Sequence, residues 1–333
     1  MTVNFPYFCL SKEQLIGQMN LLASLHTPFF FLIDYKAEHG YVIQLDDMDE
    51  AYVQFQFEGE CHLPAKETVI NEERHWDINP ISLNEFQPKF DFVQKQIHAG
   101  NSFLVNLTQP TPVRTNLSLY EMYTQSHARY KVWIKDSLLV LSPETFIRTK
   151  GRAISSYPMK GTIDATIPNA EEVIMNDPKE MAEHATIVDL IRNDLSLVAE
   201  HVEVKRYRYV ETIKTNKQDL LQVSSEITGL LPNDYLLRLG DILFDLLPEG
   251  SICGAPKAKT LEIIQDAEGY DRGYYTGICG CFDGANLDAG VMIRYMEQDG
   301  EQLIFKSGGG ITARSEMKKE YEELIQKVYV PFY

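Results

Sequence analysis

Two glutamates and a lysine near the end of the sequence have the spacing of one helix face, and they follow three consecutive glycines. Glu320, Glu323 and Lys327 are three and then four residues apart, which places them within about 60° of one another on a helix. Glycines 308 to 310 would let a strand approach a ligand closely. Two carboxylates on one face suit a hard cation such as Mg²⁺, and Lys327 could then bind a ligand carboxylate. A solvated helix face is the alternative explanation.

Two single charged residues, Glu144 and Lys160, lie beside strand-like segments. They occur in Leu141-Ser142-Pro143-Glu144 and in Pro158-Met159-Lys160-Gly161-Thr162. A lysine acts as a nucleophile only after it loses its proton, which requires partial burial or a neighbouring cation that lowers its pKa. Single charged residues beside strands are usually on the surface, and the sequence does not show their surroundings.

Glu183 is a further acidic candidate, close to the start of a predicted helix. The segment Asp177-Pro178-Lys179-Glu180 has an Asp cap, a proline in the first turn and a glutamate three residues after the cap. The helix dipole alone explains a glutamate near this end. A metal-binding role is the alternative.

A glycine-rich turn, Gly250-Ser251-Ile252-Cys253-Gly254-Ala255-Pro256-Lys257, leads into another predicted helix. Free backbone N–H groups at such a turn form a site for phosphate or carboxylate. The GxxxxGK[ST] pattern of a P-loop is absent, so the turn indicates an anion site of another kind.

The elements that must position these residues are short strands grouped between helices. Strand groups and helices do not alternate as βαβ units, so an antiparallel α+β fold is favoured over a doubly wound sheet. Helices are predicted at residues 14–25, 83–98, 177–192, 234–246, 256–267 and 315–328. Strands are predicted at residues 29–34, 41–44, 51–57, 102–113, 130–133, 137–142, 146–149, 153–156, 202–210, 220–227, 274–282, 287–296 and 302–308.

The net charge of −17 argues against a nucleic-acid partner, because phosphate binding needs a basic surface. The sequence has neither an apolar run long enough to cross a membrane nor a signal peptide, so we expect a cytoplasmic protein without a membrane partner. Five cysteines without close CxxC pairs argue against a disulfide framework or a zinc site. Cys279 and Cys281 are predicted to be buried in a strand.

Taken in order, these segments resemble the chorismate-utilising enzymes, which include anthranilate, aminodeoxychorismate, isochorismate and salicylate synthases. The resemblance implies an α+β fold with two large antiparallel β-sheets packed in the core, helices outside and a deep site between. Residues 83–333 would form the chorismate-binding core, and residues 1–82 a shortened strand and helix region of the same compact unit. The six ordered motifs are Val105-Asn106-Leu107-Thr108-Gln109, Ser142-Pro143-Glu144, Pro158-Met159-Lys160-Gly161-Thr162, residues 183–194, Gly254-Ala255-Pro256-Lys257, and Gly308-Gly309-Gly310-Ile311 with residues 320–327.

The resemblance also implies a role for each candidate. Glu183, Glu320 and Glu323 match magnesium ligands or their water-mediated neighbours. Glu144 matches the general acid that acts on the 4-hydroxyl of the ring. The residues that match the substrate-binding groups are Thr162, Gly254, Tyr275, Arg294, Gly308, Gly309, Gly310 and Lys327.

Position 160 separates the branches of this family. Anthranilate synthases resemble the motif but carry Ala there, whereas aminodeoxychorismate synthases carry a lysine that attacks C2 of chorismate. Leu104 stands where isochorismate and salicylate synthases need a lysine to activate water. Gln222, Cys253 and Tyr157 also differ from the common pattern.

The sequence therefore predicts Mg²⁺-dependent conversion of chorismate and ammonia to 4-amino-4-deoxychorismate, on the route to 4-aminobenzoate and folate. The covalent nucleophile would be Lys160 and the general acid Glu144. A separate glutamine amidotransferase would supply the ammonia. The alternatives are anthranilate synthase component I and a non-catalytic chorismate-binding homologue.

Overall fold

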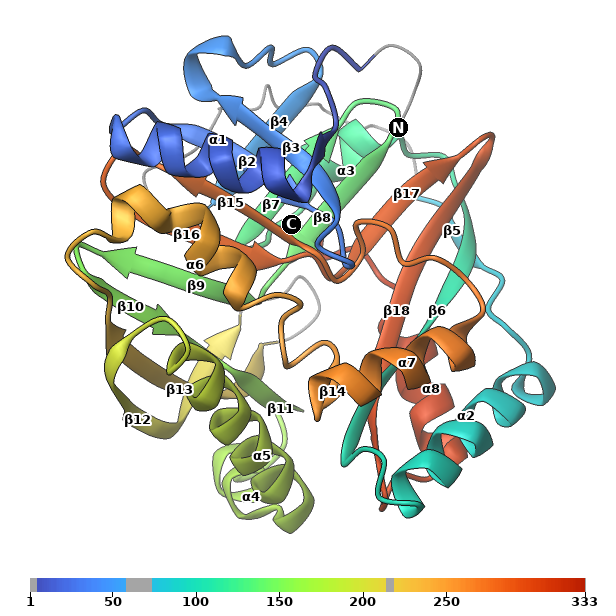
Figure 1. Ribbon diagram of the computed structural model, residues 1–333. Coiled ribbons are helices and arrows are strands. Elements are labelled where there is room, and N and C mark those ends of the chain that lie inside the picture. The colour runs from blue at the N-terminus through green and yellow to red at the C-terminus, as the bar shows by residue number, and fades with distance from the viewer. Residues whose placement is uncertain (1–4, 58–73, 214–218, 333) are drawn as a thin grey trace.

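The computed structural model describes residues 5–57, 74–213 and 219–332, and these residues form two antiparallel β-sheets with helices on their outer faces (Figure 1). The predicted α+β fold with two large antiparallel sheets is confirmed. The helices are α1 (Lys12–Ser24), α2 (Leu83–His98), α3 (Leu119–Gln125), α4 (Ala170–Asn176), α5 (Pro178–Leu195), α6 (Leu239–Asp245), α7 (Lys257–Glu268) and α8 (Met317–Gln326), with short 3₁₀ turns at Leu45–Asp47 and Tyr235–Arg238.

The first sheet has ten strands among the described residues, and strands from both ends of the chain meet in it. Its order is β1 (Leu10–Ser11), β3 (His39–Gln44), β2 (Phe29–Ile33), β15 (Ile278–Phe282), β16 (Leu287–Val291), β9 (Thr145–Lys150), β10 (Ala153–Ser156), β13 (Leu220–Leu230) and β11 (Met159–Asp164), and β12 (Glu200–Ile213) also pairs with β13.

The second sheet has eight strands in the same part of the chain. Its order is β14 (Gly254–Ala255), β6 (Leu104–Thr115), β18 (Gln302–Thr312), β17 (Tyr295–Asp299), β8 (Leu138–Ser142), β7 (Tyr130–Ile134) and β4 (Val53–Phe57), and β5 (Trp76–Ile78) also pairs with β6. Residues of the N-terminal region therefore contribute strands to both sheets.

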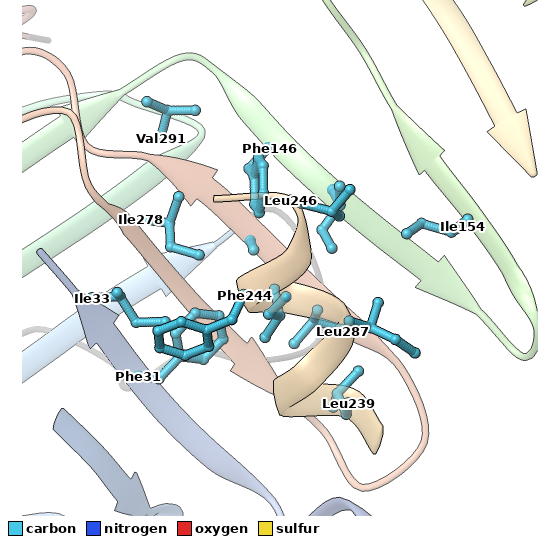
Figure 2. Packing of buried hydrophobic residues seen from close by; sticks show 14 of the residues in the cluster. Phe31, Ile33, Phe146, Ile154, Leu239, Phe244, Leu246, Ile278, Leu287 and Val291 are labelled. Atoms are coloured by element: carbon cyan, nitrogen blue, oxygen red, sulfur yellow. The ribbon is translucent and has the colours of Figure 1, made fainter. Parts of the chain in front are cut away.

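Strand β2 shows how the core is built, because successive side chains of a strand point to opposite faces. Phe30 and Leu32 pack between the two sheets, together with residues of β4, β7 and β8. Phe31 and Ile33 point the other way, toward α6, where Phe244 covers them (Figure 2). Both faces of the strand are buried, and each fully buried Phe or Ile side chain contributes about 1.5–3 kcal/mol.

Helices α2, α7 and α8 cover the end of the second sheet that carries β6 and β18 (Figure 1). Helix α2 begins as predicted, with a capping box in which the side chains and backbone N–H groups of Ser82 and Glu85 bond reciprocally. Its Phe86 and Phe90 pack with Leu324 of α8. This packing fixes the position of α8, which carries the acidic candidates.

A buried ion pair holds the glycine-rich turn against β6. The side chains of Arg272 and Glu268 are 1 % and 2 % exposed, and Arg272 Nη2 lies 2.6 Å from Glu268 Oε1. The same guanidinium donates to the carbonyl of Ile252 at 3.1 Å and to that of Asn106 at 2.7 Å. One side chain thereby fixes the turn relative to the strand beside it.

The structure differs from the predicted elements at several places. The strand predicted at residues 287–296 is two strands that belong to different sheets, with Arg294 at φ 50° just before the second. The strand predicted from residue 274 begins only at Ile278, and α3, α4 and β11 were not predicted. Cys279 and Cys281 are buried in β15 as predicted, but Cys281 is also disulfide-bonded, which its spacing did not indicate. No helix in the described ranges is both long and apolar enough to cross a membrane.

Candidate active site

Lys160 on β11 forms an ion pair with Glu183 on α5, with 2.9 Å between Nζ and Oε2. The Lys160 side chain is only 27 % exposed. Burial acts to lower its pKa, but the attraction of Glu183, with smaller contributions from Glu323 and Glu180, is stronger and raises it. The lysine of the predicted nucleophile motif is therefore a half-buried cation in an acidic environment.

The local backbone explains this position. Strand β11 has a register irregularity between Met159 and Thr162, and Gly161 adopts a φ of 89° there. A Cβ atom on Gly161 would lie 3.0 Å from Oε2 of Glu180, a buried oxygen that has no hydrogen-bond partner among the residues that the structure describes. The glycine after Lys160 thus provides both the unusual backbone conformation and the space that Glu180 occupies.

Helix α8 brings the other predicted acidic residues to the same place. Lys179 Nζ lies 3.8 Å from Glu183 Oε1 and also 3.8 Å from Glu320 Oε1, so one ammonium group bridges α5 and α8. Glu323 pairs with Lys327 at 2.6 Å. Burial raises the pKa of Glu320, and the nearby charge of Glu323 raises it further. Carboxylates and ammonium groups alternate across this region.

The three glycines of β18 do not have the same surroundings. A Cβ atom on Gly309 would lie 3.6–3.8 Å from Glu323, Glu320 and Lys327, so this glycine opens directly onto the charged cluster. One on Gly310 would lie 3.8 Å from Lys160 Nζ and 2.9 Å from Leu104 Cδ1.

Gly308 and Gly254 instead face the neighbouring strand β6. A Cβ atom on Gly308 would approach Thr108 Cγ2 to 2.5 Å, and one on Gly254, at φ 128°, would overlap the carbonyl oxygen of Leu104. Close strand packing explains these two glycines, while the Gly308 carbonyl accepts a hydrogen bond from Lys327 Nζ at 2.9 Å. Their predicted contact with a substrate stays a prediction.

Glu144 follows β8 and is hydrogen-bonded to the glycine-rich turn. Its Oε1 accepts a hydrogen bond from the Ser251 hydroxyl at 2.8 Å. Burial raises the pKa of this carboxyl group, whereas Ser251 and the positive charges of Lys160, Lys327 and Arg294 act to lower it. Glu144 is therefore within electrostatic reach of the lysine and of the predicted carboxylate-binding cations.

Tyr275 and Arg294 both interact electrostatically with Glu144. The Tyr275 ring is buried 5.9 Å from that of Tyr295, and burial raises the pKa of its hydroxyl. The Arg294 guanidinium lies 5.0 Å from the centre of the Tyr329 ring, a cation–π arrangement.

A cavity of about 210 Å³ adjoins the ion pair of Lys160 and Glu183. Its lining includes Leu104, Lys179 and Thr312. The apolar Leu104 therefore lines the cavity at the position where a lysine base was expected for isochorismate and salicylate synthases.

A model of the chorismate binding enzyme family matches residues 21–332. The chain belongs to the chorismate binding enzyme family. The predicted resemblance is confirmed at this level, and the cluster described above lies within the matched residues.

Relatives of this chorismate binding enzyme have several names. It is 46 % identical to an uncharacterized PabA-like protein of Haemophilus influenzae, over 96 % of this chain and 97 % of the relative. It is 32 % identical to aminodeoxychorismate synthase component 1 of Escherichia coli, over 76 % of this chain and 58 % of that protein. It is 30 % identical to anthranilate synthase component 1 of Archaeoglobus fulgidus, over 74 % of this chain and 61 % of that protein.

Solved structures show the same fold. An isochorismate synthase from Bacillus anthracis superposes with a TM-score of 0.73 at 17 % identity, covering 96 % of this chain and 89 % of that one. Anthranilate synthase component I from Streptococcus pneumoniae superposes with a TM-score of 0.68 at 21 % identity, covering 98 % of this chain and 81 % of that one. At these identities the likeness shows the architecture and not the reaction.

The structure of this family member brings five of the predicted charged site residues together. Lys160, Glu183, Glu320, Glu323 and Lys327 are linked through ion pairs and shared electrostatic contacts. Thr162 does not join them: it is exposed on β11 opposite Gln222, and within the described ranges no hydrogen bond connects its side chain to the cluster.

Two residues of the site were not predicted as functional. Lys179 was treated only as part of a helix start, although its spacing of four residues from Glu183 could have indicated an ion pair. Glu249 lies beside Glu144 only because the turn after α6 folds back onto the β8–β9 connection, and no local sequence pattern indicates that contact.

Proposed function

We propose that this chorismate binding enzyme aminates chorismate at C4 with ammonia and forms 4-amino-4-deoxychorismate. The observation that carries the proposal is the position of Lys160, half-buried among acidic residues and electrostatically coupled to Glu144. A nucleophile and a general acid are the two groups that such a displacement needs. The similarity to proteins named aminodeoxychorismate synthase component 1 supports the same reaction.

The proposed mechanism has two displacements. In the first, the neutral amine of Lys160 forms a bond to C2, both ring double bonds shift, and the C4–O bond breaks. Glu144 gives its proton to the departing hydroxyl, which leaves as water. In the second, ammonia forms a bond to C4, the double bonds shift back, and the bond between C2 and Lys160 breaks. The proton that the new amine loses returns to Glu144.

We also propose that Glu183, Glu320 and Glu323 would hold Mg²⁺. In the part of the chain that the structure describes, no three acidic, histidine or cysteine side chains already stand close enough to form a metal site. The ligand types nevertheless fit, because carboxylate oxygens are suitable ligands for Mg²⁺. The ammonium group of Lys179 already lies between Glu183 and Glu320, where the two negative charges require a cation. When bound there, Mg²⁺ would supply positive charge for binding a substrate carboxylate.

Lys327 and Arg294 would neutralise the remaining negative charge of the substrate. Both act on Glu144 electrostatically, which places positive charge on the same side of the site as the general acid. We propose that a separate glutamine amidotransferase delivers the ammonia, as the sequence predicts.

The test is incubation with chorismate, Mg²⁺ and an ammonium salt, followed by identification of the product by its mass and ultraviolet spectrum. The proposal expects 4-amino-4-deoxychorismate. Anthranilate as product would assign the chain to the other aminating branch. Absence of turnover at high ammonium concentration would favour a non-catalytic chorismate-binding protein.

A further inference from the structure

A second buried carboxyl group, that of Glu249, is connected to Glu144 through the hydroxyl of Ser251. Glu249, in the turn between α6 and β14, is only 5 % exposed. The Ser251 hydroxyl lies between the two acids, 2.8 Å from Glu144 Oε1 and 2.5 Å from Glu249 Oε2. The backbone N–H of Ile252 also donates to Glu249 Oε2, at 3.0 Å. The three side chains form a continuous hydrogen-bonded chain that ends at the proposed general acid.

This chain requires a proton on one of the two acids. A serine hydroxyl has a single proton, so it can donate to one carboxylate only. Both short contacts of Ser251 are hydrogen bonds only when one carboxyl group is protonated and donates to the serine oxygen. Two ionised carboxylates would leave one oxygen pair without a proton between them, at a cost that burial increases.

The surrounding charges determine where that proton lies before the reaction. Burial raises the pKa of Glu144, but three nearby cations, those of Lys160, Lys327 and Arg294, act against that rise and favour its ionised form. Glu249 instead faces two acidic groups, Glu144 and Asp194, and Asp194 is itself paired with Lys257 of α7 at 2.8 Å.

The electrostatic environment of Glu249 agrees with this assignment. Burial is the largest effect and the charge of Glu144 is the next, and together they raise the pKa of Glu249 to about 7. Hydrogen bonds from Ser251 act in the opposite direction but are weaker. Glu249 is therefore mostly protonated below neutral pH, and the cations that favour an ionised carboxylate act on Glu144.

We propose that Glu249 is a positioning residue that holds a proton for Glu144 and delivers it through Ser251. The inference rests on the proposed amination and on the role of Glu144 in it. The proton of Glu249 moves to the Ser251 oxygen while the Ser251 proton moves to Glu144 Oε1, so that no net charge is created along the chain. Glu144 then protonates the departing C4 hydroxyl. Glu249 is left as a carboxylate that the Ile252 N–H stabilises, and it recovers its proton by the reverse path when the new amine deprotonates.

Kinetics of four variants test the relay. Glu249→Gln keeps the size of the side chain but removes the transferable proton, and Ser251→Ala removes the bridge. We expect each to lower kcat by about 10²-fold or more, with KM for chorismate changed by less than about threefold. Ser251→Thr keeps the hydroxyl and should retain most of kcat. Glu262→Gln, an exposed glutamate on α7, is the matched control and should behave as wild type.

The pH profile separates a relay from a structural role. Wild-type kcat should fall as pH rises through about 7, where Glu249 loses its proton, and Glu249→Gln should lack this step. A Glu249→Gln variant that is folded by circular dichroism and keeps the wild-type kcat and pH profile would overturn the proposal.

An infrared measurement decides the question without turnover. If no protein in the series consumes chorismate, the proposed function fails, but the proton on Glu249 can still be observed. The difference spectrum between wild type and Glu249→Gln near pH 6 should contain the carbonyl band of a protonated carboxylic acid. Its presence at pH 6 and loss by pH 9 would support the relay, and its absence at pH 6 would refute it.

Discussion

Lys160 Nζ lies 2.9 Å from Glu183 Oε2, so the proposed nucleophile is held as a cation by one of the proposed magnesium ligands. Burial alone would lower the pKa of Lys160, yet Glu183, Glu323 and Glu180 outweigh it and raise the pKa. Because only a neutral amine attacks carbon, the charge of Glu183 must be compensated before Lys160 can react. If Mg²⁺ binds Glu183 as proposed, the ion pair would connect metal binding with activation of the nucleophile.

Glu183→Gln should therefore make Lys160 more reactive as an amine. Glu183 is the strongest of the groups that raise the pKa of Lys160, so removing its charge lowers that pKa. At pH 8 we expect the rate of acylation of Lys160 to rise several-fold, measured by mass spectrometry of the peptide. Mg²⁺ added to the wild type should act in the same direction. Lys259 and Glu262 form an exposed ion pair, so the rate of acylation of Lys259 in Glu262→Gln serves as the control. An unchanged labelling rate at Lys160 would contradict the link.

Lys160→Ala should lower the amination rate by about 10³-fold or more, because the first displacement loses its nucleophile. Wild type incubated with chorismate and Mg²⁺ but without ammonia should gain the mass of chorismate minus water on the peptide that contains Lys160. Lys319→Ala, an exposed position on α8, is the control. If Lys160→Ala matched wild type with ammonium as substrate, the covalent mechanism would be wrong.

Sequence patterns predicted those parts of the site that depend on local spacing. The helical spacing of Glu320, Glu323 and Lys327 and the cap of α5 are local, and both elements form as expected. The connection of Glu144 to Glu249 through Ser251 joins two residues that are 105 positions apart, in a turn that Arg272 holds from a third segment. Such contacts depend on strand order, which local periodicity does not encode.

The break before β17 has a similar origin. Residues 287–296 are apolar enough to be predicted as one strand, but Arg294 adopts a left-handed conformation and the chain moves from one sheet to the other. A non-glycine residue with positive φ is uncommon and requires tertiary contacts to hold it. The ring of Tyr329, which follows the C-terminal end of α8, provides one such contact.

Arg272→Ala should destabilise the protein by about 3–5 kcal/mol, because it leaves the buried Glu268 carboxylate without its charge partner. It should also loosen the glycine-rich turn, since the backbone carbonyls of Ile252 and Asn106 lose their hydrogen-bond donor. Urea unfolding measures the change. Removing an exposed pair with Lys319→Ala should cost less than about 1 kcal/mol. Equal effects of the two substitutions would show that the buried pair has no special role.

The stability of the wild type should depend on pH through Glu249. Its pKa is raised from 4.5 to about 7 in the folded protein, so folding favours the protonated form. The stabilisation is complete below about pH 4.5, where the unfolded chain is also protonated, and it is lost as pH rises to about 7. A shift of this size corresponds to roughly 3 kcal/mol.

Glu249→Gln has no group that titrates at this position, so its stability relative to wild type should increase by roughly that amount between pH 4.5 and 7.5. Urea denaturation at a series of pH values provides the free energies of unfolding, and Glu262→Gln should follow the wild-type curve because its side chain is exposed. A constant difference between Glu249→Gln and wild type across this range would mean that Glu249 is already ionised, which would also remove the proton on which the relay depends.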